Sequence, residues 1–416
     1  MNKKILIIDI KERYNSIISD KINEDQKSNN YFGQLLFNEL IKDNTVEIID
    51  PVQEYVKFGF KKFNKIIEET IKKFDIIIFF QIWFFGFKHN LFSDLKKKNK
   101  IKLISFDIES NEMIFIYYLK LLENFDLVLA TDSILASEIY KKKNINAEFY
   151  PISFSSKHYY PSNYEKIYDG SFMGQKHSDR ESYINFLINK NFNIKTFGSY
   201  KNERIPNEKF NKIIHQTKIN LYFSKQKKKT SRIFDLTMSY NMKYTLLQFA
   251  MLQAFFLIEY SDEHNFFLKK YNFLMFKNKN ELLDKFSYFL KNEKERVEIS
   301  KKIWADIGEK FSFEERYKNL QSKIFNIPTQ NKVNDLDINK QFFIKDLFKF
   351  PINFENSYFI INNVRLILLI KSFKIKVFSI IYFMIYLFRT FKIKTIKHLL
   401  HAFYIKNLET YKNKKI

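Results

Sequence analysis

Short, predominantly apolar runs alternate with amphipathic segments through the first 150 residues of the chain. The apolar runs lie at Lys4–Ile10, Val46–Ile49, Asp75–Phe80, Ile101–Phe106, Leu127–Ala130 and Ala147–Tyr150. Unbroken apolar runs are typical of strands buried on both faces, as in a parallel sheet that helices cover. Between them, segments such as Tyr55–Lys73 and Ser133–Lys143 have the helical period, and Ser133 is a candidate N-cap. This alternation predicts an α/β unit built on a parallel sheet.

The alternation breaks at Pro151 and restarts at Gly170, and the segment between them, which includes SSKHYYPSN, is typical of a linker. A second set of strands is predicted at Gly170–Met173, Ile194–Phe197, Ile219–Phe223 and Phe255–Tyr260. Helices are predicted at Arg180–Lys190, Asn207–Gln216 and Glu281–Lys310, with a Lys-rich loop at Gln226–Ser231. We therefore predict an α/β fold in which two Rossmann-like domains, residues 1–155 and 156–330, face each other across a cleft.

The composition changes in the last part of the chain, residues 331–416. From Arg365 to Ile416 there are 12 Lys and Arg residues against the single acid Glu409, with large apolar residues between them. This pattern predicts a basic amphipathic helical extension that lies on an anionic membrane surface. Packing of the extension against the first domain is the equally weighted alternative.

Neither end of the sequence predicts insertion into a membrane. The start, MNKKILIIDI, has the pattern of a first strand and lacks the apolar core and cleavage site of a signal peptide. Its most apolar late segment, Val377–Phe388, is shorter than the roughly 18–20 residues that a spanning helix requires. We therefore expect a cytoplasmic protein, or one peripheral on the inner face of the cytoplasmic membrane.

The formal net charge is +24, and the chain contains no cysteine. Lys, Asn, Ile, Phe and Tyr are abundant while Gly, Pro, Trp and Arg are scarce, which is the bias that AT-rich codons produce. Lys also lacks the planar fork with which Arg recognises bases and phosphates, so we do not expect a nucleic acid as partner. The absence of cysteine excludes disulfides and thiolate metal sites.

Several common nucleotide-binding and hydrolase motifs are absent from the sequence. It contains no Gly-x-Gly-x-x-Gly fingerprint, no Walker loop and no Gly-x-Ser-x-Gly elbow. In tandem Rossmann-like units, ligands bind at the carboxyl ends of the strands, in the crevice between the domains. The candidate site must therefore be sought there.

Four motifs in the second half resemble those of one enzyme family. They are Asp169–Gly174 (DGSFMG) with Arg180 shortly after it, Lys218–Ser224 (KINLYFS), Phe255–Tyr260 (FFLIEY) and the helix start Asn280–Lys285. In this order and spacing they resemble the CgeB-like, spore-maturation-protein-like family of GT-B glycosyltransferases. The resemblance covers roughly residues 100–320.

This resemblance implies a GT-B architecture and transfer of a sugar from a nucleoside diphosphate sugar. The donor would bind to the second domain, and the acceptor, a glycan, polysaccharide, lipid-linked or other surface molecule, to the first. The nucleotide sugar would be a co-substrate. Enzymes of this architecture work without a bound metal, and we therefore expect no cofactor and no metal site.

The resemblance also implies roles for individual residues. Catalytic roles fall to Asp107, as acceptor contact or base, and to Arg180, as the cation for the leaving diphosphate. Donor-binding roles fall to Gly174, Lys176, His177, Arg180, Ser224, Lys243, Gln248 and Glu259. Structural alternatives are a helix cap for Asp107, a surface ion pair with Glu181 or Asp179 for Arg180, and a polar strand end for Glu259.

The chain departs from the family pattern at three positions before the last strand. Thr245 stands where the family has Arg, and Gln248 stands where it has the Glu that grips the nucleotide ribose. Gln253 occupies the place of a small, glycine-bearing turn. Two alternative functions therefore stay open: a catalytically degenerate scaffold or partner subunit, and a charge-driven binder of membrane surfaces.

Overall fold

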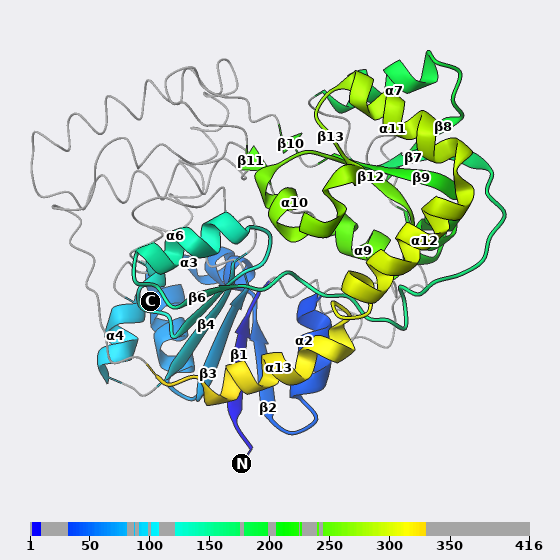
Figure 1. Ribbon diagram of the computed structural model, residues 1–416. Helices are drawn as coiled ribbons and strands as arrows, with labels where there is room; N and C mark the ends of the chain where they lie inside the picture. The colour runs from blue at the N-terminus through cyan, green and yellow to red at the C-terminus, as the bar shows by residue number, and fades with distance from the viewer. Residues whose placement is uncertain are drawn as a thin grey trace, which may run out of the picture.

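The computed structural model describes residues 2–9, 32–80, 87, 91–98, 101–107, 121–174, 179–198, 205–223, 225–226, 239–240 and 244–329 (Figure 1). These residues form two α/β units, each built around one parallel sheet. The predicted fold class is thereby confirmed. The predicted extension, residues 331–416, lies outside the described part of the chain. Within the described residues, no helix has the length and apolar character needed to cross a membrane.

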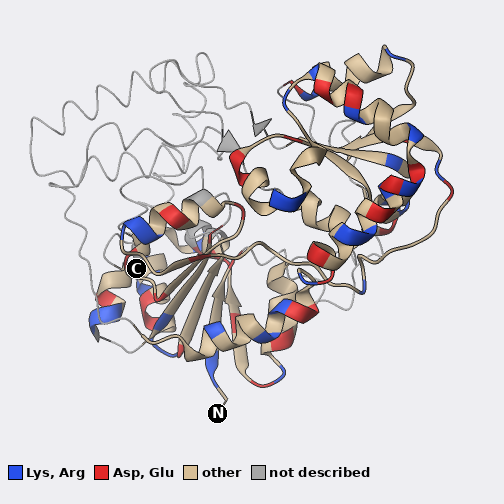
Figure 2. Cartoon of the chain, viewed as in Figure 1, with Lys and Arg blue, Asp and Glu red and all other residues tan. Residues whose placement is uncertain are grey.

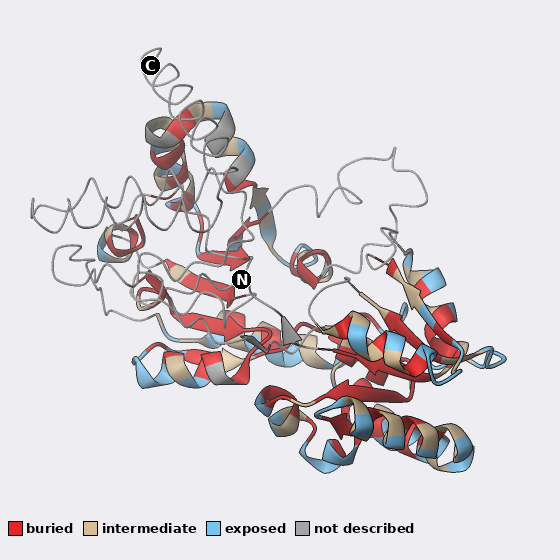
Figure 3. Cartoon of the chain, turned by 90° about the horizontal axis from the view of Figure 1, so that it is seen from above, coloured by how far each residue is buried: buried red, intermediate tan, exposed pale blue. Residues whose placement is uncertain are grey.

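The first unit contains six parallel strands in the order β2-β1-β3-β4-β5-β6. The strands are β1 (Lys4–Ile8), β2 (Thr45–Ile49), β3 (Ile76–Phe80), β4 (Lys102–Asp107), β5 (Leu127–Ala130) and β6 (Ala147–Phe149). The helices are α2 (Phe32–Leu40), α3 (Pro51–Ile71), α4 (Leu91–Lys98) and α6 (Ile134–Lys142). All six predicted strands are present, and most of their apolar residues are buried. Figure 3 shows this burial on the strands and on the helix faces that cover them.

The second unit contains five parallel strands in the order β13-β12-β9-β7-β8. The strands are β7 (Tyr168–Met173), β8 (Ile194–Phe197), β9 (Thr217–Tyr222), β12 (Phe256–Glu259) and β13 (Met275–Phe276). The helices are α7 (Arg180–Ile188), α8 (Asn207–His215), α9 (Thr245–Met251), α10 (Asp262–Phe267), η5 (Lys269–Leu274), α11 (Lys279–Lys291), α12 (Glu293–Ile303) and η6 (Trp304–Gly308). Counted along the chain within each unit, strands one to five share the order 2-1-3-4-5 in both sheets.

The last described helix, α13 (Phe313–Asn326), returns to the first unit after the second unit has been completed (Figure 1). The Phe313 ring lies 5.9 Å from the Phe32 ring of α2. Lys102 Nζ donates to the Phe325 carbonyl at 2.6 Å, and Lys323 Nζ lies 2.6 Å from the Glu148 carboxylate. The two units are therefore joined twice, by the linker before β7 and by the chain that enters α13.

A short hairpin base separates β9 from α9, where the sequence predicts only a Lys-rich loop. Its two strands, β10 (Lys225–Gln226) and β11 (Ser239–Tyr240), pair antiparallel. The basic residues 227–229 lie between these strands, outside the described residues. The pairing was not predicted because each strand has only two residues, too few to show a periodic pattern.

In the part of the chain that the structure describes, three helices are followed by a left-handed residue that is not glycine: Asn144, Asn191 and Gln253, with φ of 58°, 65° and 53°. At the end of α9, Gln253 N–H donates to the Ala250 carbonyl and Ala254 N–H to the Phe249 carbonyl. This is the Schellman arrangement, which usually has glycine at the left-handed position. The turn after α9, where the family resemblance leads us to expect a glycine, therefore has a left-handed backbone at Gln253 although this residue is not glycine.

Candidate functional site

The most informative place in the second unit is the carboxyl edge of its sheet between β7 and β9. These neighbouring strands form the switch point, because the chain leaves β7 for β8 on one side and leaves β9 for β12 on the other. Connections diverge at such a point and leave room for a ligand. Gly174 follows β7 and Phe223 follows β9, so both lie at this edge.

Gly174 is needed here for close packing. A Cβ atom at this position would lie 2.9 Å from Cζ of the Phe172 ring, closer than real side chains approach. The Gly174 N–H donates to the Phe197 carbonyl at 3.4 Å. Gly174 therefore keeps the loop after β7 close to the sheet, and its own N–H is engaged with β8.

Arg180 is the buried cation of this edge. It is the first residue of α7 and is only 5% exposed. Its Nη2 donates to the Phe223 carbonyl at 3.1 Å, and its guanidinium lies 5.7 Å from the centre of the Phe172 ring. Burial lowers the pKa of Arg180, and the nearby Glu259 and Tyr222 oppose that shift. Arginine stays charged even so, and its burial does not fit the alternative of a surface ion pair.

Glu259 provides negative charge beside this cation. It ends β12, the strand next to β9, and is 7% exposed. Because Arg180 donates to Phe223 at the end of β9, Glu259 lies one strand away from the bonded carbonyl, and the field of its carboxylate raises the pKa of Arg180. Buried opposite charges stabilise each other only while both are present. The fold thus places the predicted residues Arg180 and Glu259 at the same edge of the second sheet.

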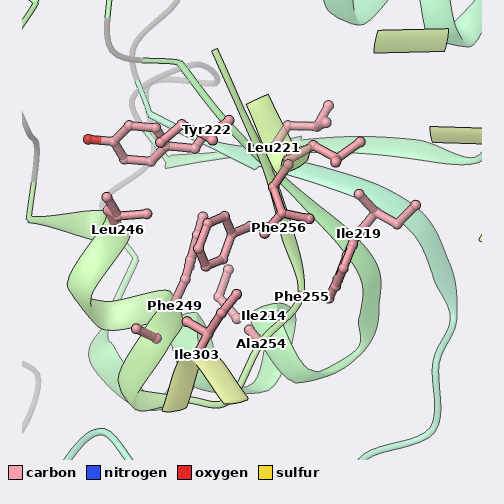
Figure 4. Close-up of a cluster of buried hydrophobic side chains, with 14 of the residues drawn as sticks. Ile214, Ile219, Leu221, Tyr222, Leu246, Phe249, Ala254, Phe255, Phe256 and Ile303 are labelled. Atoms are coloured by element: carbon pink, nitrogen blue, oxygen red, sulfur yellow. The ribbon is translucent and has the colours of Figure 1, made fainter. Parts of the chain in front are cut away.

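Gln248 lies on α9 and points to the linker between the units. Its Nε2 donates to the Tyr159 hydroxyl at 2.7 Å, and that hydroxyl lies 3.3 Å from Oδ1 of Asn207. Figure 4 shows the neighbouring residues of α9, Leu246 and Phe249, packed with Tyr222 of β9 and Phe256 of β12. The structure therefore ties the Gln248 amide to Tyr159.

The other predicted donor-binding residues cannot be placed beside these. Lys176, His177, Ser224 and Lys243 lie outside the described residues, so their roles stay predictions. Sequence neighbours of each are described: Gly174 before the first two, Phe223 before Ser224 and Tyr244 after Lys243.

Asp107 occupies the carboxyl end of β4 in the first unit, as the sequence predicts. Its side chain is fully buried, and its carboxylate accepts the hydroxyl proton of Tyr140 on α6. Its carbonyl accepts from the Thr131 side chain at 3.1 Å. These contacts give Asp107 a structural role at the edge of the sheet, and its role as base or acceptor contact stays a prediction.

The carboxyl edges of the two sheets meet through residues that the sequence analysis did not select. Thr131 Oγ1 lies 3.2 Å from the Tyr244 hydroxyl, and Glu263 of α10 accepts hydrogen bonds from Ser133 and Ile134. Acidic residues mark the start of α10 in Figure 2. Ser133 was recognisable as an N-cap, but its partner on the other unit has no local signal in the sequence.

His264 was also missed. It is fully buried, its Nδ1 lies 3.0 Å from the Glu259 carbonyl, and its ring meets the Tyr222 ring edge to face at 5.2 Å. Burial lowers its pKa to about 4, although the hydrogen bond to Glu259 opposes this. His264 is therefore neutral and supports the backbone at the end of β12.

The described residues contain no group of three or more His, Cys, Asp or Glu side chains that could hold a metal ion. Whether the reaction needs a metal is a separate matter, and the expectation of a metal-independent reaction stays a prediction.

Comparison with known proteins identifies one part of the chain. Residues 180–322 match the model of a family described as glycosyl transferase-like. The matched segment runs from Arg180 into α13 and includes Gln248, Glu259 and Glu263. No curated protein matches the chain.

Three solved structures illustrate what the fold of this chain is similar to. A DNA-modifying β-glucosyltransferase, described with and without uridine diphosphoglucose, is 16% identical, with a TM-score of 0.45 over 78% of this chain and 99% of its own. HepE of Anabaena, in complex with UDP and glucose, is 10% identical, with a TM-score of 0.49 over 77% and 100%. TarM is 10% identical, with a TM-score of 0.43 over 63% and 57%.

Proposed function

We propose that this protein transfers a sugar from a nucleoside diphosphate sugar to a glycan, polysaccharide or other surface acceptor, without a metal ion. The observation that carries the proposal is the glycosyl transferase-like segment 180–322. That segment begins at Arg180, the residue whose charge the fold buries at the switch point of the second sheet.

The chemistry of sugar transfer fits this position. As the bond to the sugar breaks, negative charge develops on the leaving diphosphate, and a fixed cation stabilises it without reorganisation. Arg180 is held by the Phe223 carbonyl and the Phe172 ring, so its guanidinium is preorganised. A preorganised cation in a site of low dielectric acts more strongly than the same charge in water. Arg180 would therefore act on the diphosphate.

The first unit would bind the acceptor, with Asp107 at its carboxyl edge. The resemblance to CgeB-like GT-B enzymes supports this division of labour. Residues 365–416, with their excess of Lys and Arg, would hold the enzyme on an anionic membrane at its cytoplasmic face. Acceptors attached to lipid would then be within reach.

Nucleotide binding and transfer test the proposal directly. We expect calorimetry on the full chain to detect at least one nucleoside diphosphate, with the matching nucleotide sugar hydrolysed or transferred in a panel assay that contains EDTA. The corresponding nucleosides, which lack the diphosphate, serve as controls and should bind much more weakly. Failure of every nucleoside diphosphate and nucleotide sugar to bind would overturn the proposal.

A specific observation favours a second candidate, a GT-B scaffold without catalytic activity. Gln248 stands in place of a family Glu, and its amide is bound to Tyr159 of the linker. A scaffold would keep its cellular function when Arg180 and Lys243 are both changed to Ala, whereas an enzyme would lose it.

A further inference from the structure

One turn of the first unit contacts the second unit at two places. This turn, residues 131–134, follows β5 and leads into α6. On one side the Thr131 hydroxyl lies 3.2 Å from the hydroxyl of Tyr244, the residue that precedes α9. On the other side Ser133 and Ile134 contact Glu263 of α10. Both helices that flank β12 are therefore attached to the same turn.

Glu263 uses both carboxylate oxygens in this contact. Oε1 accepts from the Ser133 hydroxyl at 2.5 Å, and Oε2 accepts from the Ile134 N–H at 2.8 Å. Ser133 is also the N-cap of α6, since its Oγ accepts from the Ala136 N–H at 2.9 Å. Glu263 is 2% exposed and Ser133 is fully buried. Water is therefore largely excluded from the contact.

The contact favours the arrangement of the two units in this structure. The first N–H groups of a helix have no partner within the helix, and the helix dipole favours negative charge at that end. A carboxylate from the other unit satisfies the Ile134 N–H and gains a charge-assisted hydrogen bond. A different arrangement that left the Glu263 carboxylate buried without these donors would be costly.

The contact is also close in sequence to the candidate donor site. Glu263 follows Glu259 by four residues, and Glu259 ends β12 at the carboxyl edge of the second sheet, where Arg180 donates to Phe223 at the end of the neighbouring β9. Ser133 follows the end of β5, whose Ala130 is paired with Asp107 of β4. The hydrogen bonds of Glu263 thus connect the two edges where donor and acceptor would bind.

We propose that Glu263 is a positioning residue for the sugar transfer: by capping α6 of the opposite unit, it sets the separation and orientation of the donor and acceptor edges. The inference rests on the proposed function. Transfer depends steeply on the geometry of the reacting groups, and a misplacement of about 1 Å can cost about a hundred-fold in rate. Glu263 itself touches neither substrate.

The arrangement of the units can be measured without any activity. Because the chain contains no cysteine, Lys142→Cys and Lys294→Cys together introduce the only two thiols. Lys142 is an exposed residue of α6 in the first unit, and Lys294 is an exposed residue of α12 in the second unit. Spin labels at both sites report the distance between the units by double electron–electron resonance. The distance distribution is compared for the labelled parent, Glu263→Gln, Glu263→Ala and the control Asp262→Asn.

Asp262→Asn is a matched control because it removes one negative charge from the neighbouring residue of the same helix. Asp262 is exposed and accepts from Tyr260 within its own unit. We expect the control to keep the distance distribution of the parent. Glu263→Ala should broaden or shift it, and Glu263→Gln should do so less, because the amide oxygen still accepts one hydrogen bond.

The kinetic result separates positioning from a purely structural role. In Glu263→Ala the affinity for the nucleoside diphosphate should stay within about two-fold of the parent, while kcat falls about ten-fold or more. An unchanged distance distribution in Glu263→Ala would overturn the proposal, as would an unchanged kcat. If no variant binds a nucleotide, the proposed function fails, but the distance measurement still shows whether Glu263 sets the arrangement.

Removal of the partner group provides a second route if Glu263→Ala does not fold. Ser133→Ala deletes the hydroxyl that donates to Glu263 Oε1 and also caps the Ala136 N–H, and it leaves the Glu263 carboxylate in place. We expect the same direction of change in the distance distribution. In the double variant Ser133→Ala with Glu263→Gln, the changes should be less than additive, because both substitutions remove one contact. Full additivity would contradict the inference.

Discussion

The Arg180 guanidinium donates to the Phe223 carbonyl, with 3.1 Å between Nη2 and the carbonyl oxygen. This hydrogen bond connects the start of α7, which follows β7, to the end of β9. The two strands are neighbours at the switch point of the sheet. The bond therefore holds together the two sides of the place where a nucleotide would bind. The same side chain, Arg180, both stabilises this edge and supplies its positive charge.

Arg180→Ala should affect both stability and nucleotide binding. Loss of the buried hydrogen bond should lower the free energy of unfolding by about 1–3 kcal/mol, and loss of the cation should weaken nucleoside diphosphate binding about ten-fold or more. Urea unfolding and calorimetry measure the two effects. The control is Lys218→Ala, which breaks a half-exposed ion pair with Asp169 elsewhere in the same sheet.

Lys218→Ala should lower the free energy of unfolding by no more than about 1 kcal/mol and leave nucleotide binding unchanged. If Arg180→Ala lowers stability but binds nucleotide like the parent, Arg180 is a structural residue and the donor site lies elsewhere.

Gln253→Gly should stabilise the second unit. Gln253 has a φ of 53°, in the left-handed region where a side chain is strained and glycine is not. We expect the free energy of unfolding to rise by up to about 1 kcal/mol, as measured by urea unfolding. Gln216→Gly is the matched control, because Gln216 ends α8 with a φ of −76°. That substitution should not stabilise the protein, and stabilisation of the two variants by equal amounts would refute the strain at Gln253.

Gly308→Ala should destabilise the packing of η6 on α9. A Cβ atom at Gly308 would lie 2.4 Å from the Ala250 carbonyl oxygen and 2.7 Å from its carbon. Because both atoms belong to the backbone, the clash can be removed only if η6 moves away from α9. We therefore expect the free energy of unfolding to fall by about 1–3 kcal/mol. The exposed neighbour Ala305, changed to Ser, should alter stability by less than about 0.5 kcal/mol. A thermal unfolding curve for Gly308→Ala that overlays the parent would contradict this close approach.

Stability should fall with acidification between about pH 6.5 and pH 4. Burial lowers the pKa of His264 to about 4 in the folded protein, so in this range the unfolded chain takes up a proton that the folded protein does not. His215 should have the same effect, because its burial lowers its pKa to about 4 as well. Each histidine contributes a loss of at most about 1.4 kcal/mol per pH unit.

Urea unfolding of the parent and of His264→Phe at pH 7 and pH 5 checks this expectation. The substitution lowers stability at both pH values, because it removes the hydrogen bond to the Glu259 carbonyl. Its slope against pH should nevertheless be shallower than that of the parent. Equal slopes would show that His264 does not resist protonation in the folded state.

The strands and most helices follow from the sequence because their signals are local. An apolar run such as Ile76–Phe80 is stable where both faces are covered, and a serine such as Ser133 is favoured at the start of a helix, where its hydroxyl accepts from a free N–H group. The alternation of such elements along the chain then determines a parallel sheet in each half. Gly174 and Arg180 were selected through the motif that resembles the glycosyltransferase family, DGSFMG with an Arg shortly after it.

The tertiary structure decided which side chains meet. Three contacts join residues far apart in sequence: the hydrogen bond of buried Arg180 to Phe223, the hydrogen bond of Gln248 with Tyr159, and the capping of α6 by Glu263. Such pairs depend on the order of the strands in each sheet and on how the two units dock. The spacing of apolar residues along the chain predicts neither, because it reports only local secondary structure. The sequence by itself therefore determined the elements and the edge at which a ligand would bind, whereas three-dimensional packing determined the partners of the residues at that edge.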